Sequence, residues 1–270
     1  MQPVSIGDMD DARLNPFRDL KRSNENRRSN MFVAEGGKLL DRMIEVGWPI
    51  VSVVLTPTAY DEFQHRIPPD VPIYLVEKKS IEELIGFHFH RGVLASGRRP
   101  DFLNLARLIP PEGPTTVLML VDIHDPENVG NIIRTASSLG VSSIVMTSLC
   151  ADPFSRRVLR TSMGGVLLKP IAIVEEPVRA IASLRLHYSL QTWATVLAED
   201  AIPLSQAKAG PRRLIVVGNE GDGLSPECIN ACERKVTIPM APHADSLNVA
   251  VASGIILYHF CRSESAVEPA

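Results

Sequence analysis

The stretch Val121-Asp-Ile-His-Asp-Pro-Glu-Asn-Val-Gly-Asn-Ile-Ile-Arg-Thr-Ala136 follows an apolar run and leads into a helical pattern. Two later stretches have the same layout, Gly218-Asn-Glu-Gly-Asp-Gly-Leu224 and Ile238-Pro-Met-Ala-Pro-His-Ala-Asp-Ser-Leu-Asn248. Open α/β sheets build their sites from loops at the carboxyl ends of parallel strands. The three loops therefore predict an enzyme whose site lies at one edge of one sheet.

Beyond Pro114, apolar strand-like segments alternate regularly with helical segments. The expected strands are residues 117–121, 143–146, 167–173, 192–197, 214–217 and 235–238. The expected helices are residues 131–139, 155–161, 177–186, 226–233 and 247–260. Because the strands are apolar throughout, we expect a mostly parallel α/β sheet covered by helices on both faces.

The first hundred residues predict a smaller α/β domain. A helix with Leu39, Leu40 and Met43 on one side precedes strands at residues 50–55 and 71–76, and a short helix follows at residues 79–84. The proline and glycine content of residues 96–101 and 109–114 is typical of a linker. We therefore expect an N-terminal domain at residues 1–96, a linker at 97–113 and a C-terminal domain at 114–270.

Composition sets the protein class. The 270 residues are 45% hydrophobic and 22% charged, with a net charge of -3, as in a soluble globular protein. The sequence has no apolar run long enough for a membrane span, and its first residues lack the regions of a signal peptide. Four unevenly spaced cysteines do not form a disulfide framework. We expect a cytoplasmic protein without a membrane segment.

Basic residues cluster locally although the chain is mildly acidic. From Arg13 to Arg28 there are six basic residues against two acidic ones. Further clusters contain Arg98, Arg99, Arg156, Arg157 and Arg160. A solvated polar face explains any one cluster. Several clusters together indicate phosphate contacts, because binding depends on the field of a patch and not on total charge.

The first loop has the composition of a ligand-binding turn at a helix start. Asn128 stands where a helix cap belongs, and Gly130 allows a ligand to approach the first helical amides. Arg134 follows one turn later, so its guanidinium can extend back over the loop. The alternative is that Asn128 only caps the helix and Arg134 pairs with a surface carboxylate.

The other two loops bear on the kind of ligand and on the polar groups of the site. Glycines at 218, 221 and 223 do not form a Gly-x-Gly-x-x-Gly fingerprint, and they come late in the domain, which disfavours a classical dinucleotide site. Ser246 and Asn248 place two short polar side chains at a helix start, where capping accounts for only one of them.

Cysteines and histidines give no metal signature. Cys228 and Cys232 lack a second Cys/His pair nearby, so we expect no metal. The alternation His88-Phe-His90 predicts one face of a strand. His124 and His243 are expected in solvated loop positions.

The three loops resemble, in order, the three signature motifs of the SpoU/TrmH RNA ribose 2'-O-methyltransferases. They are similar to that family's Asp-Pro-x-Asn-x-Gly-x-x-x-Arg-Thr-Ala, Gly-x-Glu-x-x-Gly-Leu, and Ile-Pro-Met followed by Ser-Leu-Asn-Val. Arg160-Thr-Ser-Met-Gly-Gly165 resembles the family's Ser-x-Gly-Ala segment, with Gly165 in place of the usual Ala. Phe32–Gly36 and His90–Ala95 resemble its ribosomal-protein-like substrate-binding domain, with Arg91 in place of a frequent Gln. The resemblance covers nearly the whole chain.

The resemblance implies a C-terminal domain folded as a trefoil knot, S-adenosylmethionine as cofactor, and a homodimer that completes the site. It implies that residues 1–96 bind the RNA substrate and that residues 114–270 carry the methyltransferase activity. It places four residues at the cofactor: Leu197, Gly218, Ile238 and Leu247. It places five residues at catalytic positions: Asn128, Arg134, Glu220, Ser246 and Asn248.

The implied reaction needs such a set, because a ribose 2'-hydroxyl is a poor nucleophile that requires in-line positioning and help with its proton. The resemblance makes Arg134 the proton acceptor. A guanidinium is essentially always protonated, so we expect Arg134 to bind the adjacent phosphate and the developing alkoxide instead. We expect Asn128 to orient Arg134, and Ser246 and Asn248 to hold the ribose or the loop. Glu220 is expected to accept backbone amides or an arginine.

The partners follow from the same resemblance. We expect Arg22, Arg27, Arg28 and Arg91 to bind RNA. Ribosomal RNA is expected because the N-terminal domain resembles that of rRNA-modifying members, and tRNA is the alternative. The rival classes are a non-catalytic RNA-binding protein of the same fold, which would not need the five catalytic positions, and a nucleotide-dependent metabolic enzyme, which would need the missing fingerprint.

The helix expected at residues 247–260 bears on the oligomeric state. It carries more apolar residues than a helix buried on one side needs. We therefore expect part of it to face a second subunit, and the alternative is a helix buried within its own monomer.

Overall fold

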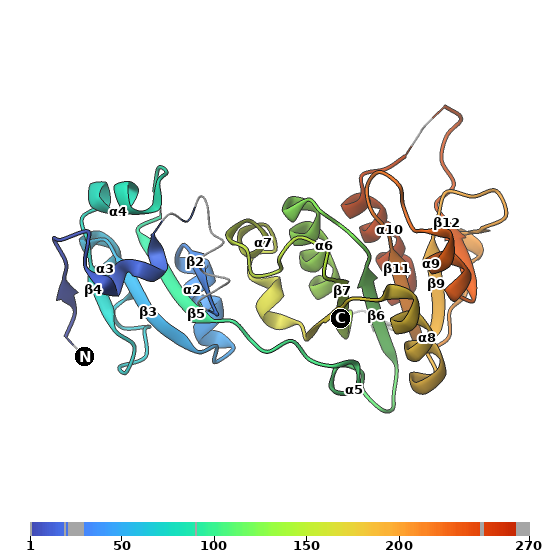
Figure 1. Cartoon of the computed structure of the whole chain (residues 1–270), viewed down its shortest axis with the longest axis horizontal. Helices are drawn as coiled ribbons and strands as arrows, with labels where there is room; N and C mark the ends of the chain where they lie inside the picture. Colours follow the sequence, from blue (N-terminus) through green and yellow to red (C-terminus); the bar gives the residue numbers. More distant parts are fainter. Residues whose placement is uncertain (1, 19, 21–29, 90, 244–245, 263–270) are drawn as a thin grey trace, which may run out of the picture. The chain divides into compact units, whose positions relative to one another are not determined.

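The computed structural model of the chain describes residues 2–18, 20, 30–89, 91–243 and 246–262. They form two compact units (Figure 1). The first unit comprises Met1–Asp101 and Asp152–Leu168, and the second comprises Phe102–Ala151 and Lys169–Ala270. No helix within the described ranges is long and apolar enough to cross a membrane.

The first unit contains a mixed five-stranded sheet with the order β1-β4-β3-β5-β2. The strands are β1 (Val4–Ser5), β2 (Met31–Glu35), β3 (Ile50–Leu55), β4 (Ile73–Leu75) and β5 (Val93–Arg98). β1, β4 and β3 are parallel, whereas β5 is antiparallel to both β3 and β2. The helices of this part are η1 (Ala12–Phe17), α2 (Gly37–Glu45), α3 (Pro57–Phe63) and α4 (Lys78–Ile85).

Residues 152–168 pack into the first unit although they follow residue 114 in the chain. They contain α7 (Arg156–Thr161) and η2 (Gly165–Leu168). Phe154 is buried against Phe32, at 5.3 Å between ring centroids, and against Trp48, at 5.8 Å. Arg156 donates from Nε to the buried Glu35 carboxylate at 2.7 Å.

The compact units therefore differ from the expected division at residues 97–113. Position 97 lies inside β5, where it pairs with both β2 and β3, so the strand continues past the expected boundary. The return of residues 152–168 to the first unit depends on ring packing and an ion pair between residues far apart in sequence. Neither periodicity nor linker composition carries that information.

The second unit is built on a seven-stranded sheet with the order β10-β12-β9-β11-β6-β7-β8. The strands are β6 (Thr115–Leu120), β7 (Ser143–Thr147), β8 (Ile171–Val174), β9 (Gln191–Thr195), β10 (Ile202–Pro203), β11 (Arg212–Val217) and β12 (Arg234–Thr237). Every neighbouring pair is parallel, which confirms the expected parallel α/β class. All seven carboxyl ends therefore lie along one edge.

Helices cover both faces of this sheet. The helices are α5 (Leu105–Leu108), α6 (Pro126–Ser138), α8 (Pro177–Tyr188), η3 (Leu204–Gln206), α9 (Pro226–Ala231) and α10 (Val249–Arg262). Residues of α8 and α9 share one buried cluster with Ala194 of β9. The neighbouring residue Trp193 packs against Phe260 of α10 with tilted rings, at 5.1 Å between ring centroids. Because successive strand residues point to opposite faces, α10 lies on the face opposite α8 and α9.

Three local predictions were wrong. The helix expected from residue 131 begins at Pro126, because Asp125 caps it by accepting from the Glu127 amide at 2.8 Å and proline suits the first helical position. The strand expected at residues 167–173 is a 3-10 helix at Gly165–Leu168 followed by β8. His88 lies outside any strand, because α4 ends at Gly86 in a left-handed conformation and the chain turns; His90 is outside the described residues.

Candidate functional site

The loops after β6 and β11 meet where the strand order reverses. The chain continues from β6 to β7 and β8 on one side, whereas β11 and β9 lie on the other. Asn219 donates from its side-chain amide to the Asp122 carbonyl at 2.7 Å, and its Oδ1 accepts from the Gly221 amide at 2.7 Å. Such a reversal is where open α/β sheets place their ligand sites. The first two sequence loops therefore lie together, as expected.

Asn128 connects all three loops. Its Nδ2 donates to Glu220 Oε1 at 2.8 Å, and its Oδ1 accepts from Asn248 Nδ2 at 3.0 Å. Asn128 is buried, with 8% of its surface exposed, so water competes little for these two hydrogen bonds. One amide on α6 thus fixes the loop after β11 and the start of α10 relative to each other.

This role of Asn128 differs from the expected one. Asp125 caps the helix in its place, and the side-chain amide of Asn128 bonds to Glu220 and Asn248 and not to Arg134. Because α6 begins five residues earlier than expected, Asn128 faces inward from within the first helical turn. Glu220 accepts from Asn128, where a backbone amide or an arginine was expected.

A cavity of about 590 Å³ opens at the same edge of the sheet. Its wall comes from the loops after β9, β11 and β12 and from the first half of α10. The structure brings all four expected cofactor residues into this wall: Leu197, Gly218, Ile238 and Leu247. Of the five expected catalytic residues, Glu220 and Ser246 also line it. A cavity of this size matches an ordinary small-molecule site.

Gly218 closes the wall by tight backbone contact. A Cβ atom there would lie 2.4 Å from the carbonyl carbon of Gly223 and 2.5 Å from the amide nitrogen of Leu224. Asn219 and Gly223 exchange two backbone hydrogen bonds, at 3.2 and 3.1 Å, which fold the loop back on itself. Only glycine fits this fold-back, because both contacts are with backbone that cannot rotate away.

Charged side chains in the wall are few. Glu220 and Asp222 are the acidic ones, and Lys235 is the basic one among the described residues of the wall. Lys235 forms an ion pair with Asp200, which lowers the pKa of that carboxyl. The remaining wall is largely apolar, with Val217, Leu224 and Ile256 among its residues, which suits a ligand that has a large planar or aliphatic part.

Arg134 does not line this cavity. It lies on α6, two turns beyond the first loop, with an exposed side chain, and its carbonyl accepts from Ser138 at 3.0 Å. Because α6 begins earlier than expected, residue 134 lies farther along the helix than the sequence interpretation assumed.

Asn248 starts α10. Its Oδ1 accepts from the amides of Ala250 and Val251 at 2.8 and 3.3 Å, while its Nδ2 holds Asn128. The helix start expected at Leu247 is thus correct within two residues. Ser246 is exposed at the cavity, and capping does not account for it.

Sequence reasoning missed two residues of the site, of which Asn219 had a sequence signal and Lys235 had none. Asn219 follows Gly218 directly, and asparagine between glycines commonly hydrogen-bonds to its own turn. Its Nδ2 also lies 3.1 Å from His124 Nδ1, so the imidazole of this exposed histidine accepts there when that nitrogen is unprotonated. Lys235 had no sequence signal, because a charged residue in a strand reads as a sheet edge.

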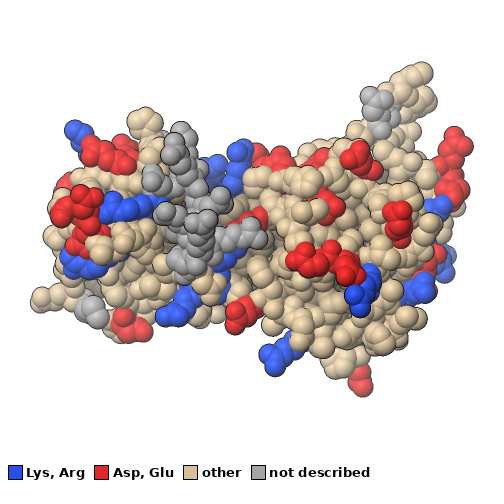
Figure 2. Space-filling model, in the orientation of Figure 1, with Lys and Arg blue, Asp and Glu red and all other residues tan. Residues whose placement is uncertain are grey.

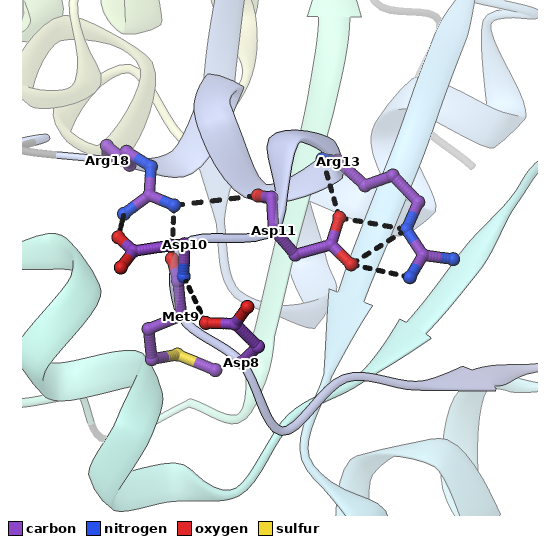
Figure 3. Close-up of polar contacts among 6 residues, drawn as sticks. All are labelled: Asp8, Met9, Asp10, Asp11, Arg13 and Arg18. Atoms are coloured by element: carbon purple, nitrogen blue, oxygen red, sulfur yellow. Dashed lines mark hydrogen bonds and ion pairs between the residues drawn. The ribbon is translucent and has the colours of Figure 1, made fainter.

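The basic run near the N-terminus is partly neutralised. Arg13 pairs with Asp11 at 2.5 Å, which lowers the pKa of the Asp11 carboxyl to about 2 (Figure 3). Arg18 donates to the Met9 carbonyl and to Asn15, and lies 3.8 Å from Asp10. For these two arginines the solvated-face interpretation holds. On the face drawn in Figure 2, acidic and basic side chains are interspersed.

The expected RNA-binding residues are only partly described. Arg22, Arg27 and Arg28 lie outside the described residues. Arg91 is exposed and its side chain lies directly over Gly36, where a Cβ atom would be 2.6 Å from Arg91 Cδ. The two segments that resemble a substrate-binding domain therefore touch through these two residues.

Cys228 and Cys232 offer no reactive thiolate. Burial raises the pKa of Cys228 and raises that of Cys232 to about 12. Both thiols are therefore protonated at neutral pH, which disfavours nucleophilic and metal-ligand roles. Among the described residues no group of three or more His, Cys, Asp or Glu side chains could hold a metal ion.

Residues 115–258 match the SpoU rRNA Methylase family. A tRNA/rRNA methyltransferase from Mycobacterium bovis is 32% identical over 98% of this chain and 93% of its own. The 23S rRNA (guanosine-2'-O-)-methyltransferase RlmB from Acinetobacter baylyi is 32% identical over 72% of this chain and 80% of its own. A solved AdoMet-bound rRNA methyltransferase from Sinorhizobium meliloti has a TM-score of 0.84 and 26% identity, covering 98% of this chain and 100% of its own.

The fold and the site thus define an RNA-modifying enzyme. The chain belongs to the SpoU rRNA Methylase family, and it is an RNA ribose methyltransferase.

Proposed function

We propose that the protein transfers the methyl group of S-adenosylmethionine to a ribose 2'-hydroxyl of ribosomal RNA. The observation that carries this is the joining of all three loops, through Asn128, beside a cavity lined by Leu197, Gly218, Ile238 and Leu247. The AdoMet-bound state of the similar Sinorhizobium meliloti enzyme supports the cofactor.

The residues present fit this cofactor. The wall combines an apolar surface for an adenine ring with the glycine-rich loop 218–223, which folds so tightly on itself that a Cβ atom at Gly218 would meet the backbone of Gly223 and Leu224. Acidic Glu220 and Asp222 suit the positive charges of a sulfonium and an ammonium group, and Lys235 suits a carboxylate. When bound, the cofactor supplies an electrophilic methyl group.

The chain's own residues would prepare the RNA. Ser246, exposed at the cavity, is placed to hydrogen-bond the ribose, and Asn128 holds Glu220 and Asn248 in register with it. A guanidinium matches the geometry of a phosphate, so the role of Arg134 is to bind the adjacent phosphate and stabilise the developing alkoxide. Its position outside the cavity of its own chain supports a site completed by a second subunit.

A homodimer would bury the exposed stripe of α10. Val251, Ile255 and Tyr258 recur on one side of this helix and are 53%, 41% and 52% exposed, whereas Ile256 and Phe260 are buried within the unit. An apolar stripe at helical spacing on a surface marks an interaction site. One set of apolar residues of α10 thus packs in the core of its own unit, and the other set would pack against a second copy of the chain.

The RNA target rests on the relatives. The Acinetobacter enzyme acts on 23S rRNA, while other relatives are described as tRNA/rRNA methyltransferases, so tRNA is the alternative. Residues 1–96 would bind the RNA, and the arginines that would contact it are Arg22, Arg27, Arg28 and Arg91. The protein would act in the cytoplasm, without a metal.

Mapping of 2'-O-methyl groups in RNA from a deletion strain and its parent tests the target. We expect one rRNA position to lose its methyl group and to regain it on complementation. Loss confined to tRNA would favour the alternative. Unchanged rRNA and tRNA would favour a non-catalytic RNA-binding protein.

A further inference from the structure

Ser253 is a polar residue in an apolar helix face. It belongs to the inward stripe of α10 with Val249, Ile256, Leu257 and Phe260, all at helical spacing and all 9% exposed or less. Ser253 itself has 0% of its surface exposed. A hydroxyl buried among such neighbours loses its hydrogen bonds to water and requires a partner.

No described residue provides that partner. The Ser253 hydroxyl has no hydrogen bond within the described part of the chain. Other helical hydroxyls of this protein bond to the carbonyl four residues earlier: Thr161 to Arg157 at 2.7 Å and Ser138 to Arg134 at 3.0 Å. The usual local solution is therefore available in this fold but is not used at Ser253.

The position of Ser253 suggests what the missing partner is. Ser253 forms part of the cavity wall, together with Val249 and Ile256 of the same helix and residues of the loop after β11. Rotation about its Cα–Cβ bond moves the hydroxyl between staggered positions, so the oxygen can turn toward a ligand against this wall. A buried polar group without a protein partner requires an explanation, and at a cavity wall a bound ligand is one such explanation.

We propose that Ser253 is a cofactor-binding residue whose hydroxyl completes its hydrogen bonding on bound S-adenosylmethionine. The inference rests on the proposed function. It extends that function from the loops after β9, β11 and β12, which form most of the cavity wall, to a side chain within α10.

The Ser253→Ala variant gives effects of opposite sign on stability and affinity. Removing an unsatisfied buried hydroxyl raises Tm without cofactor, by about 2–4 °C, and alanine also favours the helix. Losing one hydrogen bond to the cofactor weakens its affinity by about five- to tenfold. A hydroxyl with only a structural role would change stability alone.

Ser143 provides a matched control. It is the first residue of β7, is fully buried, and its hydroxyl also lacks a partner within the described part of the chain, but it does not line the cavity. Ser143→Ala should raise Tm and leave the affinity for S-adenosylmethionine unchanged.

The experiment compares the full-length wild type with both variants by differential scanning calorimetry and by titration with S-adenosylmethionine. Weaker binding by Ser253→Ala alone, with no fall in Tm, is the expected result. An affinity within twofold of wild type, a lowered Tm, or an equal affinity loss in Ser143→Ala would overturn the inference. If the wild type itself does not bind the cofactor, the proposed function fails and the inference fails with it.

Discussion

Replacing Gly218 by alanine tests whether the fold-back of the loop after β11 builds the cavity wall. The added methyl group would lie 2.4 Å from the Gly223 carbonyl carbon and 2.5 Å from the Leu224 amide nitrogen, about 1 Å inside ordinary contact. Backbone atoms cannot rotate away, so the loop must open. The expected clash is thus with the protein's own backbone, before any ligand enters.

The magnitude follows from what the opening disrupts. The two backbone bonds between Asn219 and Gly223 are worth about 1 kcal/mol each, and overpacking costs about 1–3 kcal/mol. Gly218→Ala should therefore lower the free energy of unfolding by about 3–5 kcal/mol. Since the same loop lines the cavity, the affinity for S-adenosylmethionine should fall by at least about tenfold.

Gly210→Ala is the matched control, because a Cβ atom at Gly210 meets no atom within 4 Å. Urea unfolding and calorimetric titration of both variants and the wild type provide the comparison. If Gly218→Ala matches Gly210→Ala in both measurements, the wall does not depend on this close approach and the assignment of Gly218 is refuted.

Two further predictions concern the reaction and the assembly. Arg134→Ala should reduce the rate of single-turnover methyl transfer by about 100-fold or more, and Arg134→Lys should reduce it as well. The affinity for the cofactor should stay within about twofold of wild type, because Arg134 does not line the cavity of its own chain. Normal transfer by Arg134→Ala at saturating RNA would show that Arg134 is dispensable. Light scattering should show a dimer for the wild type and a monomer for Ile255→Asp, because the substitution places a charge in the exposed apolar stripe of α10. A monomeric wild type at micromolar concentration would contradict the dimer.

The sheet of the second unit could be predicted because strands such as β6, β7 and β8 are mostly apolar and do not alternate between polar and apolar residues. That pattern requires cover on both faces, which parallel sheets have, and parallel strands bring their carboxyl ends to one edge. The convergence of Gly218, Ile238 and Leu247 on one cavity follows from that geometry alone. The knot implied by the family resemblance stays a prediction.

The partners of individual side chains could not be predicted. Asp125-Pro126 is a recognisable helix start, but the sequence interpretation took Asn128 as the helix cap. Asn128 and Arg134 therefore lie at later positions in α6 than that interpretation expects. The links from Asn128 to Glu220 and Asn248 join residues about a hundred positions apart, and no local propensity encodes them. Packing of Phe154 on Phe32 is a long-range contact of the same kind.

The most direct test of the central claim is the position of the transferred methyl group on RNA. The full-length protein is incubated with unmodified ribosomal RNA and S-adenosylmethionine, and the RNA is digested to nucleosides and analysed by mass spectrometry. The account predicts that the added methyl group appears on the ribose fragment of one nucleoside, and only when the cofactor is present. A methyl group on the base, or no methylated nucleoside in either rRNA or tRNA, would contradict it.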